Sequence, residues 1–96
     1  MHIHEFQNMM RRIYYSKDSK RGVNGTYVWL IEEVAELGKA LQGESKVALE
    51  DEFADVLAWL SSLANLAGCD LEAAALRKYD GKCPRCRREP CHCNQT

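Results

Sequence analysis

Two short acidic phrases have the residue types and the spacing of a metal site. Glu33 and Glu36 are three positions apart in the first phrase, and Glu52 and Asp55 are three positions apart in the second. On an α-helix such pairs lie on one face, so the two members of each pair point the same way. Four carboxylates brought together repel one another unless cations lie between them. Divalent cations such as Mg²⁺ prefer oxygen ligands, and Mg²⁺ is the usual ion where phosphates are handled.

A solvated helix face is the ordinary explanation for acidic residues spaced in this way. The flanking sequence favours a metal site instead, because residues 29–31 and 56–60 are continuous apolar runs and no basic residue follows the first phrase before Lys39. Carboxylates within apolar segments need cations or donors that offset the loss of water. We therefore predict that the two phrases bind a divalent metal.

Helical apolar spacing places each phrase on its own helix. The apolar positions are Ile31, Val34 and Leu41 around the first phrase, and Leu49, Phe53, Val56, Leu60 and Leu63 around the second. Thr26 and Ser45 are typical N-cap residues, and Gly68 is a typical helix end. The sequence predicts helices over 26–42 and 45–67, which pair as an antiparallel hairpin because their connection is short.

Two more helices complete the predicted fold. Apolar residues at helical spacing predict an amphipathic helix over 2–15. Residues 16–25 are rich in turn formers and predict a loop. Asp70 is the expected cap of a short helix over 70–79. The sequence has no alternating strand pattern, so the predicted fold is an all-α bundle of four helices.

The predicted loop carries Lys17 and Arg21. Basic groups beside an acidic metal cluster suit a polyphosphate, because metal ions alone do not neutralise every phosphate oxygen. A solubilising loop explains the same residues equally well. Trp29 can stack on a base, although packing in a core or an interface is the commoner role of such a residue.

Length and charge set bounds on the function. A chain of 96 residues forms one domain with at most a small appendage. Its net charge of −1 does not call for a nucleic-acid or membrane partner. No apolar run approaches membrane-spanning length, and the N-terminus lacks the basic-then-apolar order of a signal peptide. We therefore expect a cytoplasmic protein.

Four of the five cysteines cluster near the C-terminus with the pattern C-x₂-C-x₄-C-x-C. They are Cys83, Cys86, Cys91 and Cys93. C-x₂-C is the spacing of zinc knuckles, and four thiolates complete a tetrahedral Zn²⁺ site, in which Cys93 or His92 supplies the fourth ligand. Free or disulfide-bonded thiols are the alternative, and the complete ligand set favours zinc. We predict a helical domain over 1–80 and a zinc-knuckle-like tail over 81–96.

The order of these phrases resembles that of one known family. The residues that carry the resemblance are 14–25, 29–37, 51–57 and 63–72. Their Glu-x-x-Glu, Glu-x-x-Asp and closing Gly-x-Asp-Leu phrases are similar to those of the MazG-like nucleoside triphosphate pyrophosphohydrolases, which belong to the all-α NTP pyrophosphatase superfamily. The resemblance implies hydrolysis of a nucleoside triphosphate to the monophosphate and pyrophosphate, with Mg²⁺, or Mn²⁺ in its place, as cofactor. The cysteine tail departs from the common family pattern.

The resemblance also implies roles for single residues. The metal ligands are Glu33, Glu36, Glu52 and Asp55, with Glu32 as an accessory or water-orienting group. Asn65 and Lys78 lie near positions where the family carries polar and basic groups, so they join Lys17, Arg21 and Trp29 as candidates for substrate contacts. Family members form dimers or dimers of dimers. The wide apolar faces of this chain also predict at least a homodimer, because one small bundle cannot bury them all.

Two classes of function follow. The first is a Mg²⁺-dependent nucleoside triphosphate pyrophosphohydrolase that cleans the nucleotide pool. The second is a non-catalytic dimeric binding module whose basic zinc knuckle recognises nucleic acid or protein. The complete set of carboxylates favours the enzyme, because a scaffold has no need for it. The expected partners are therefore a nucleoside triphosphate and a second copy of the chain, without membrane or nucleic acid.

Overall fold

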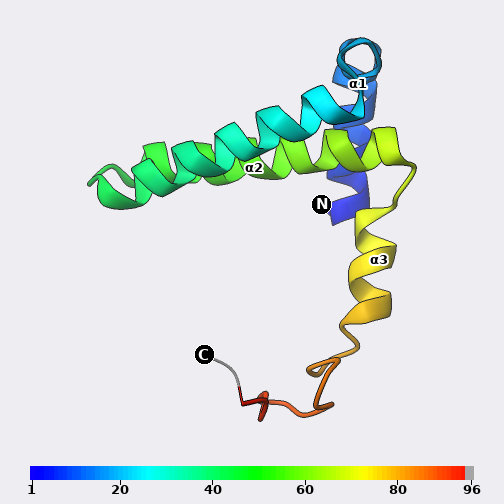
Figure 1. Ribbon diagram of the computed structural model, residues 1–96, viewed down its shortest axis with the longest axis vertical. Coiled ribbons are helices and arrows are strands. Elements are labelled where there is room, and N and C mark those ends of the chain that lie inside the picture. The colour runs from blue at the N-terminus through cyan, green and yellow to red at the C-terminus, as the bar shows by residue number, and fades with distance from the viewer. Residues whose placement is uncertain (95–96) are drawn as a thin grey trace.

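The computed structural model describes residues 1–94, and this part of the chain is all-α. Its elements are α1 (Ile3–Gln42), α2 (Lys46–Ala67) and α3 (Leu71–Lys78). The second half of α1 and the whole of α2 lie side by side as an antiparallel hairpin, and α3 leads away from the base of the hairpin to an irregular tail (Figure 1). The predicted fold class is confirmed. The prediction of four helices is wrong, because the described chain has three.

The predicted loop over 16–25 is wrong, because α1 runs through this segment. Gly22 alone departs from helical geometry, with φ 84° and ψ 171°, a conformation open to glycine because it lacks Cβ. One residue therefore produces the sharp bend between the two halves of α1 in Figure 1. Thr26, the expected N-cap, lies inside the helix and is fully buried. Packing of its side chain thus outweighs the turn-forming composition around it.

The predicted caps Ser45, Gly68 and Asp70 are confirmed, whereas the predicted end of the first helix at residue 15 is wrong because it lies inside α1. Ser45 accepts a hydrogen bond from the backbone N–H of Ala48 at 3.1 Å, and Asp70 accepts one from Ala73 at 3.0 Å. Gly68 ends α2 in the left-handed conformation, with φ 72°. These local caps fix where the hairpin arm α2 begins and where α3 starts.

A small polar network joins the first half of α1 to the end of α2. The side-chain amide of Gln7 donates to Asn65 Oδ1 at 3.0 Å and to the carbonyl of Cys69 at 2.7 Å. Its Oε1 accepts from the N–H of Leu71 at 2.9 Å, and Asn65 Nδ2 donates to the carbonyl of Gln7 at 3.1 Å. Gln7 and Asn65 are both buried, so this fully paired network fixes the base of the hairpin.

The hydrophobic core of a single chain is small. Among the described residues the buried hydrophobic side chains are Met10, Leu30 and Ala64, and the fully buried side chains are Thr26 and Ser61. None of the described helices is both long enough and apolar enough to cross a bilayer.

Candidate functional site

Three carboxylates meet between the two arms of the hairpin. Glu33 comes from α1, and Glu52 and Asp55 come from α2; an oxygen of each lies within 4.8 Å of the other two. Glu52 and Asp55 share a helix face because they are three positions apart, and the antiparallel pairing brings Glu33 opposite them. The structure thus brings together three of the four carboxylates predicted as metal ligands.

Glu36 and Glu32 are not part of this group of three. One carboxylate oxygen of Glu36 accepts a hydrogen bond from Lys39 Nζ at 3.3 Å, and its side chain is half-exposed. Glu32 is exposed. Both lie near enough for their negative charge to contribute to the raised pKa of Glu33. Their roles as metal ligand and accessory group stay predictions.

The cluster of Glu33, Glu52 and Asp55 carries negative charge that no ion pair within the described chain balances. Burial raises the pKa of Glu33 above its ordinary value, and the charges of Glu52 and Asp55 raise it further. Oε2 of Glu52 is buried and receives no hydrogen bond from the described residues. A buried carboxylate oxygen without a donor is unfavourable. A divalent cation bound by these carboxylates would satisfy that oxygen and offset the repulsion, so the three residues fit a metal ion.

A hollow of about 250 Å³ opens beside Asp55. It is lined by Tyr14, Lys17, Asp18, Arg21, Asp55, Ala58, Trp59 and Ser62. Lys17 and Arg21 are four positions apart on α1, so they extend from one helix face. The structure therefore places both predicted phosphate-binding cations beside a carboxylate of the metal group, although they stand on a helix and not in a loop.

Asp18 is a residue of this hollow that the sequence analysis did not single out. It is 2% exposed, and its Oδ1 accepts a hydrogen bond from Arg21 Nη1 at 2.8 Å. The guanidinium of Arg21 lies 4.7 Å from the ring centroid of Trp59. A carboxylate and an aromatic face therefore hold Arg21 in place at the hollow. The three-residue spacing of Asp18 and Arg21 was a signal for this pair, but only if the segment is read as helix.

The two tryptophans pack against each other across the hairpin. The rings of Trp29 and Trp59 are stacked, with centroids 5.7 Å apart and an interplanar angle of 14°. Trp29 remains 51% exposed, and Trp59 lines the hollow. The packing role of Trp29 is visible in this contact, and its contact with a base stays a prediction.

Asn65 and Lys78, the other two residues predicted to contact substrate, lie away from this hollow. Asn65 is about 15 Å further along α2 than Asp55 by helical rise, and its amide is engaged with Gln7. Lys78 is in the last turn of α3 and lines a hollow of the tail. Within one chain neither side chain reaches the metal group, so their contacts with substrate stay predictions.

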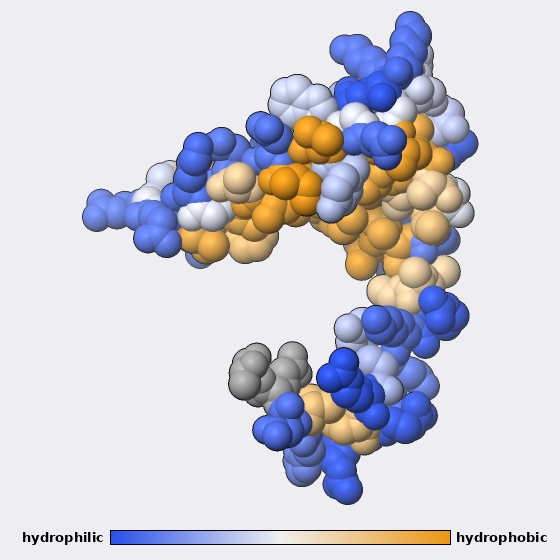
Figure 2. Space-filling model, viewed as in Figure 1, coloured by the Kyte–Doolittle hydropathy of each residue, from blue (hydrophilic) through white to orange (hydrophobic). Residues whose placement is uncertain are grey.

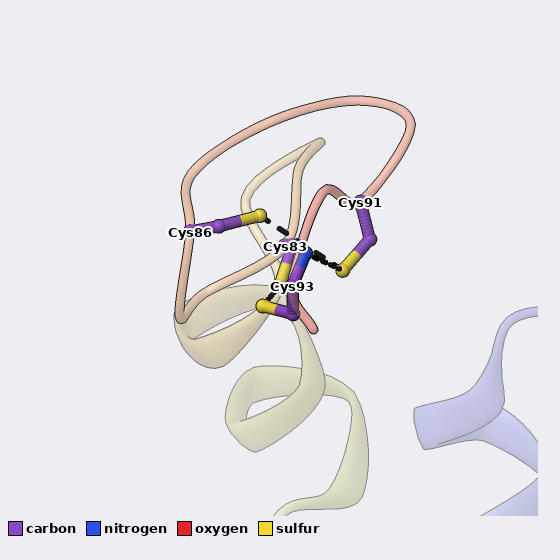
Figure 3. A group of neighbouring side chains, drawn as sticks. All are labelled: Cys83, Cys86, Cys91 and Cys93. Carbon is purple, nitrogen blue, oxygen red and sulfur yellow. Dashed lines mark hydrogen bonds between the residues drawn. The ribbon is translucent and has the colours of Figure 1, made fainter. Parts of the chain in front are cut away.

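The tail brings its four cysteines into a second group. Four sulfur atoms lie within 4.8 Å of one another, those of Cys83, Cys86, Cys91 and Cys93. Figure 3 shows these sulfurs gathered around one centre. Backbone N–H groups lower the pKa of Cys83 to about 6, whereas the neighbouring thiol of Cys91, followed by burial, raises the pKa of Cys93 to about 12. Cys93, and not His92, is the fourth member of this group.

One known family matches most of the chain. The model of the MazG nucleotide pyrophosphohydrolase domain matches residues 22–87, which is more than half of the chain. The matched segment contains the three carboxylates and begins at the bend in α1, so it excludes Lys17, Asp18 and Arg21. No curated protein matches the chain.

Proposed function

The chain belongs to the MazG nucleotide pyrophosphohydrolase family, and we propose that it hydrolyses nucleoside triphosphates to nucleoside monophosphates and pyrophosphate in a Mg²⁺-dependent reaction. The observation that carries this proposal is the group of Glu33, Glu52 and Asp55 beside a hollow with two cationic side chains. An anion of high charge requires both features, because metal and cations together neutralise its oxygens. Removal of non-standard or excess nucleotides is the expected cellular role.

The three carboxylates would hold the Mg²⁺, or Mn²⁺ in its place. When bound, the ion supplies positive charge that neutralises phosphate oxygens and polarises the phosphoryl group. Lys17 and Arg21 bind phosphate oxygens from the α1 side of the hollow, and Asp18 keeps Arg21 oriented. The proton of the attacking water passes to a second carboxylate on α1, that of Glu36 or Glu32, which lies beside Glu33.

Exposed apolar side chains on the hairpin support assembly as a homodimer or a dimer of dimers. The exposed fractions are 51% for Trp29, 49% for Ile31, 46% for Val34, 53% for Phe53 and 38% for Leu57. Figure 2 shows hydrophobic surface along the hairpin, including the side that faces the tail. A second copy that covers this surface would supply the core that one chain lacks and enclose the site.

A non-catalytic binding module is the second candidate function. The basic residues of the tail favour it, and they are Lys82, Arg85, Arg87 and Arg88. Such a module would bind an acidic protein or nucleic acid through the tail. It assigns no role to the three carboxylates, so the hydrolase remains the better-supported function.

Pyrophosphate release from a panel of ribo- and deoxyribonucleoside triphosphates, with and without Mg²⁺, tests the proposal. We expect release that depends on Mg²⁺ and falls to background in Asp55→Asn. Absence of release from every nucleotide would reject the hydrolase. Binding of labelled nucleic acid that is lost in Arg85→Gln and Arg88→Gln would then support the binding module.

A further inference from the structure

The tail from Gly81 onward needs a stabilising element other than a hydrophobic core. Apart from its cysteines and prolines, residues 81–94 are polar, charged or glycine. The segment forms no helix and lies beyond α3, away from the hairpin (Figure 1). Ordering an irregular chain carries an entropic cost that such a composition cannot offset by burial. A cross-link or a bound metal is the usual remedy in small segments of this kind.

The distances between the sulfurs distinguish a metal from disulfides. Sγ of Cys83 lies 3.7 Å from Sγ of Cys93, and Sγ of Cys86 lies 3.9 Å from Sγ of Cys91. A disulfide requires a separation of about 2.0 Å. A tetrahedral zinc site with metal–sulfur distances of about 2.3 Å has sulfurs about 3.8 Å apart. These two separations therefore match a tetrathiolate zinc site, and all four sulfurs lie within 4.8 Å of one another.

Backbone amides orient two of the sulfurs. The N–H of His92 donates to Sγ of Cys86 at 3.3 Å, and the N–H of Cys93 donates to Sγ of Cys91 at 3.3 Å. Hydrogen bonds of this kind hold ligand groups in place and stabilise thiolate charge. The side chain of His92 is not part of the sulfur group, which leaves Cys93 as the fourth ligand.

Backbone hydrogen bonds close a tight turn over residues 83–88, which carries the first two cysteines of the tail. The N–H of Arg87 donates to the carbonyl of Cys83 at 2.7 Å, and the N–H of Cys83 donates to the carbonyl of Arg88 at 3.1 Å. Arg87 has φ 61°, a left-handed conformation that is unfavourable for a residue with a side chain. The turn thus places Cys83 and Cys86, the first two members of the sulfur group, on one compact loop.

The charge of the tail also suits a tetrathiolate. Four thiolates and one Zn²⁺ leave a net negative charge at the centre. Three cations, Lys82, Arg85 and Arg88, line one hollow with Cys83, Cys91 and Cys93, and Glu89 carries the single carboxylate within 81–94. Positive side chains around the cluster therefore balance the charge of the bound form.

We propose that Cys83, Cys86, Cys91 and Cys93 bind one structural Zn²⁺, which folds the tail independently of the carboxylate group in the hairpin. Four protein ligands leave no open position, so this ion has a structural role and no substrate site. Thiolates select zinc and carboxylates select magnesium, so the two sites do not exchange metals. The proposal goes beyond the proposed hydrolase and does not depend on it.

Elemental analysis of the full chain, purified without chelators, is the first test. We expect one zinc per chain in the wild type, and loss of zinc in Cys83→Ser and Cys93→Ser. Cys69→Ser is the matched control, because this fifth cysteine is exposed and outside the group. It should keep one zinc per chain, and so should His92→Ala. Zinc lost from His92→Ala but kept in Cys93→Ser would overturn the assigned ligand set.

Thiol reactivity of the wild-type protein tests the site without relying on a variant that folds. We expect one thiol per chain, Cys69, to react at once with a thiol reagent, and four more to react only after a zinc chelator is added. Far-ultraviolet circular dichroism should barely change on chelation, because the helices lie outside the tail. A zinc-free protein with five freely reactive thiols, or with disulfides in the tail, would overturn the proposal. Neither readout measures hydrolysis, so a negative activity assay leaves this test unaffected.

Discussion

Glu33 on α1 and Glu52 on α2 face each other across the hairpin, and a carboxylate oxygen of Glu33 lies within 4.8 Å of one of Glu52. Burial of Glu33 and the charge of Glu52 both raise the pKa of Glu33. The partner, Glu52, keeps a buried oxygen without a donor among the described residues. Two like charges held this way oppose folding, so the pair marks a candidate functional site. A divalent cation bound between them would offset the repulsion.

Replacement of a carboxylate by its amide should remove activity without disturbing the fold. Glu33→Gln or Asp55→Asn keeps the size of the side chain and removes one ligand charge. We expect turnover to fall by at least about 100-fold, the loss that follows removal of one group that stabilises charge in a transition state. Glu50→Gln is the matched control, because Glu50 is exposed on α2 and outside the group. Near wild-type turnover of Glu33→Gln at saturating Mg²⁺ would reject the assignment.

The metal-free protein should lose stability as the pH rises. The pKa of Glu33 is raised in the folded state, so folding favours its protonated form. Its favourable contribution is fully present below the ordinary value of 4.5 and is lost as the pH rises through the raised pKa. In chelator at neutral pH, Glu33→Gln should therefore melt at a higher temperature than the wild type. Thermal melts that place the variant below the wild type would contradict this.

Addition of Mg²⁺ should reverse the order of these two melting temperatures. A ligand that binds only the folded protein raises its stability, and the raise grows with ligand concentration. The wild type should gain several degrees at millimolar Mg²⁺, whereas Glu33→Gln should gain little. An equal gain in both proteins would mean that Mg²⁺ binds elsewhere.

The helix ends of the hairpin were predictable because they depend on local chemistry. Ser45, Gly68 and Asp70 make cap contacts with residues a few positions away, which the sequence displays directly. The bend at Gly22 was not predictable in the same way. Burial of Asp18 and Thr26 against other parts of the fold keeps the surrounding segment helical, and such contacts are invisible in local composition.

The carboxylates of the site were also predictable in part, where their placement depends on spacing along one helix. Three-residue spacing predicted that Glu52 and Asp55 share a face, and the antiparallel hairpin predicted that Glu33 meets them. The same spacing predicted that Glu36 joins the group, but spacing on one helix does not say which side chain of a pair meets the facing helix. Which of them reaches the facing helix depends on the register of the hairpin, and Glu36 is left beside Lys39.

Lys17 should contribute to substrate affinity more than to the fold. It lines the hollow, and no hydrogen bond or ion pair ties it to the described chain. Lys17→Gln should raise the KM for the triphosphate by about 10-fold, the value of one hydrogen bond to a charged group, with a smaller effect on kcat. Lys20→Gln is the matched control, because Lys20 is exposed on the same helix and does not line the hollow. Equal KM values for the two variants would remove Lys17 from the site.

Arg21 should depend on the shape of its side chain as well as on its charge. It donates to Asp18 and lies against the ring of Trp59, contacts that suit a planar guanidinium. Arg21→Lys keeps the positive charge but should lower both affinity and melting temperature. A variant with wild-type KM and melting temperature would show that charge alone is required.

The ion pair of His4 and Glu72 should show itself in the titration of His4. Nδ1 of His4 lies 2.9 Å from Oε2 of Glu72, and this contact raises the pKa of His4 and lowers that of Glu72. The contribution of His4 to the stability of the fold is fully present below pH 6.5 and is lost as the pH rises through the raised pKa of His4. The contribution of Glu72 to the stability of the fold is fully present above pH 4.5 and is lost as the pH falls through the lowered pKa of Glu72. Nuclear magnetic resonance should find a pKa above 6.5 for His4 that returns to its ordinary value in Glu72→Gln.

Self-association should follow from the exposed face of the hairpin. Phe53 is 53% exposed and Leu57 is 38% exposed on α2, whereas a single chain buries few hydrophobic side chains. A stable protein interface removes about 800 Å² from each partner, so a dimer of this kind would cover most of the exposed apolar face. Light scattering at micromolar concentration should give at least twice the mass of one chain.

Variants on two different surfaces test whether the hairpin forms this interface. Phe53→Asp should weaken association, because it places a charge within the proposed apolar contact. Leu76→Asp is the matched control, because Leu76 is 67% exposed on α3, outside the hairpin. It should leave the mass unchanged. A wild-type monomer with full activity would contradict the dimer, and a dimer disrupted only by Leu76→Asp would move the interface to α3.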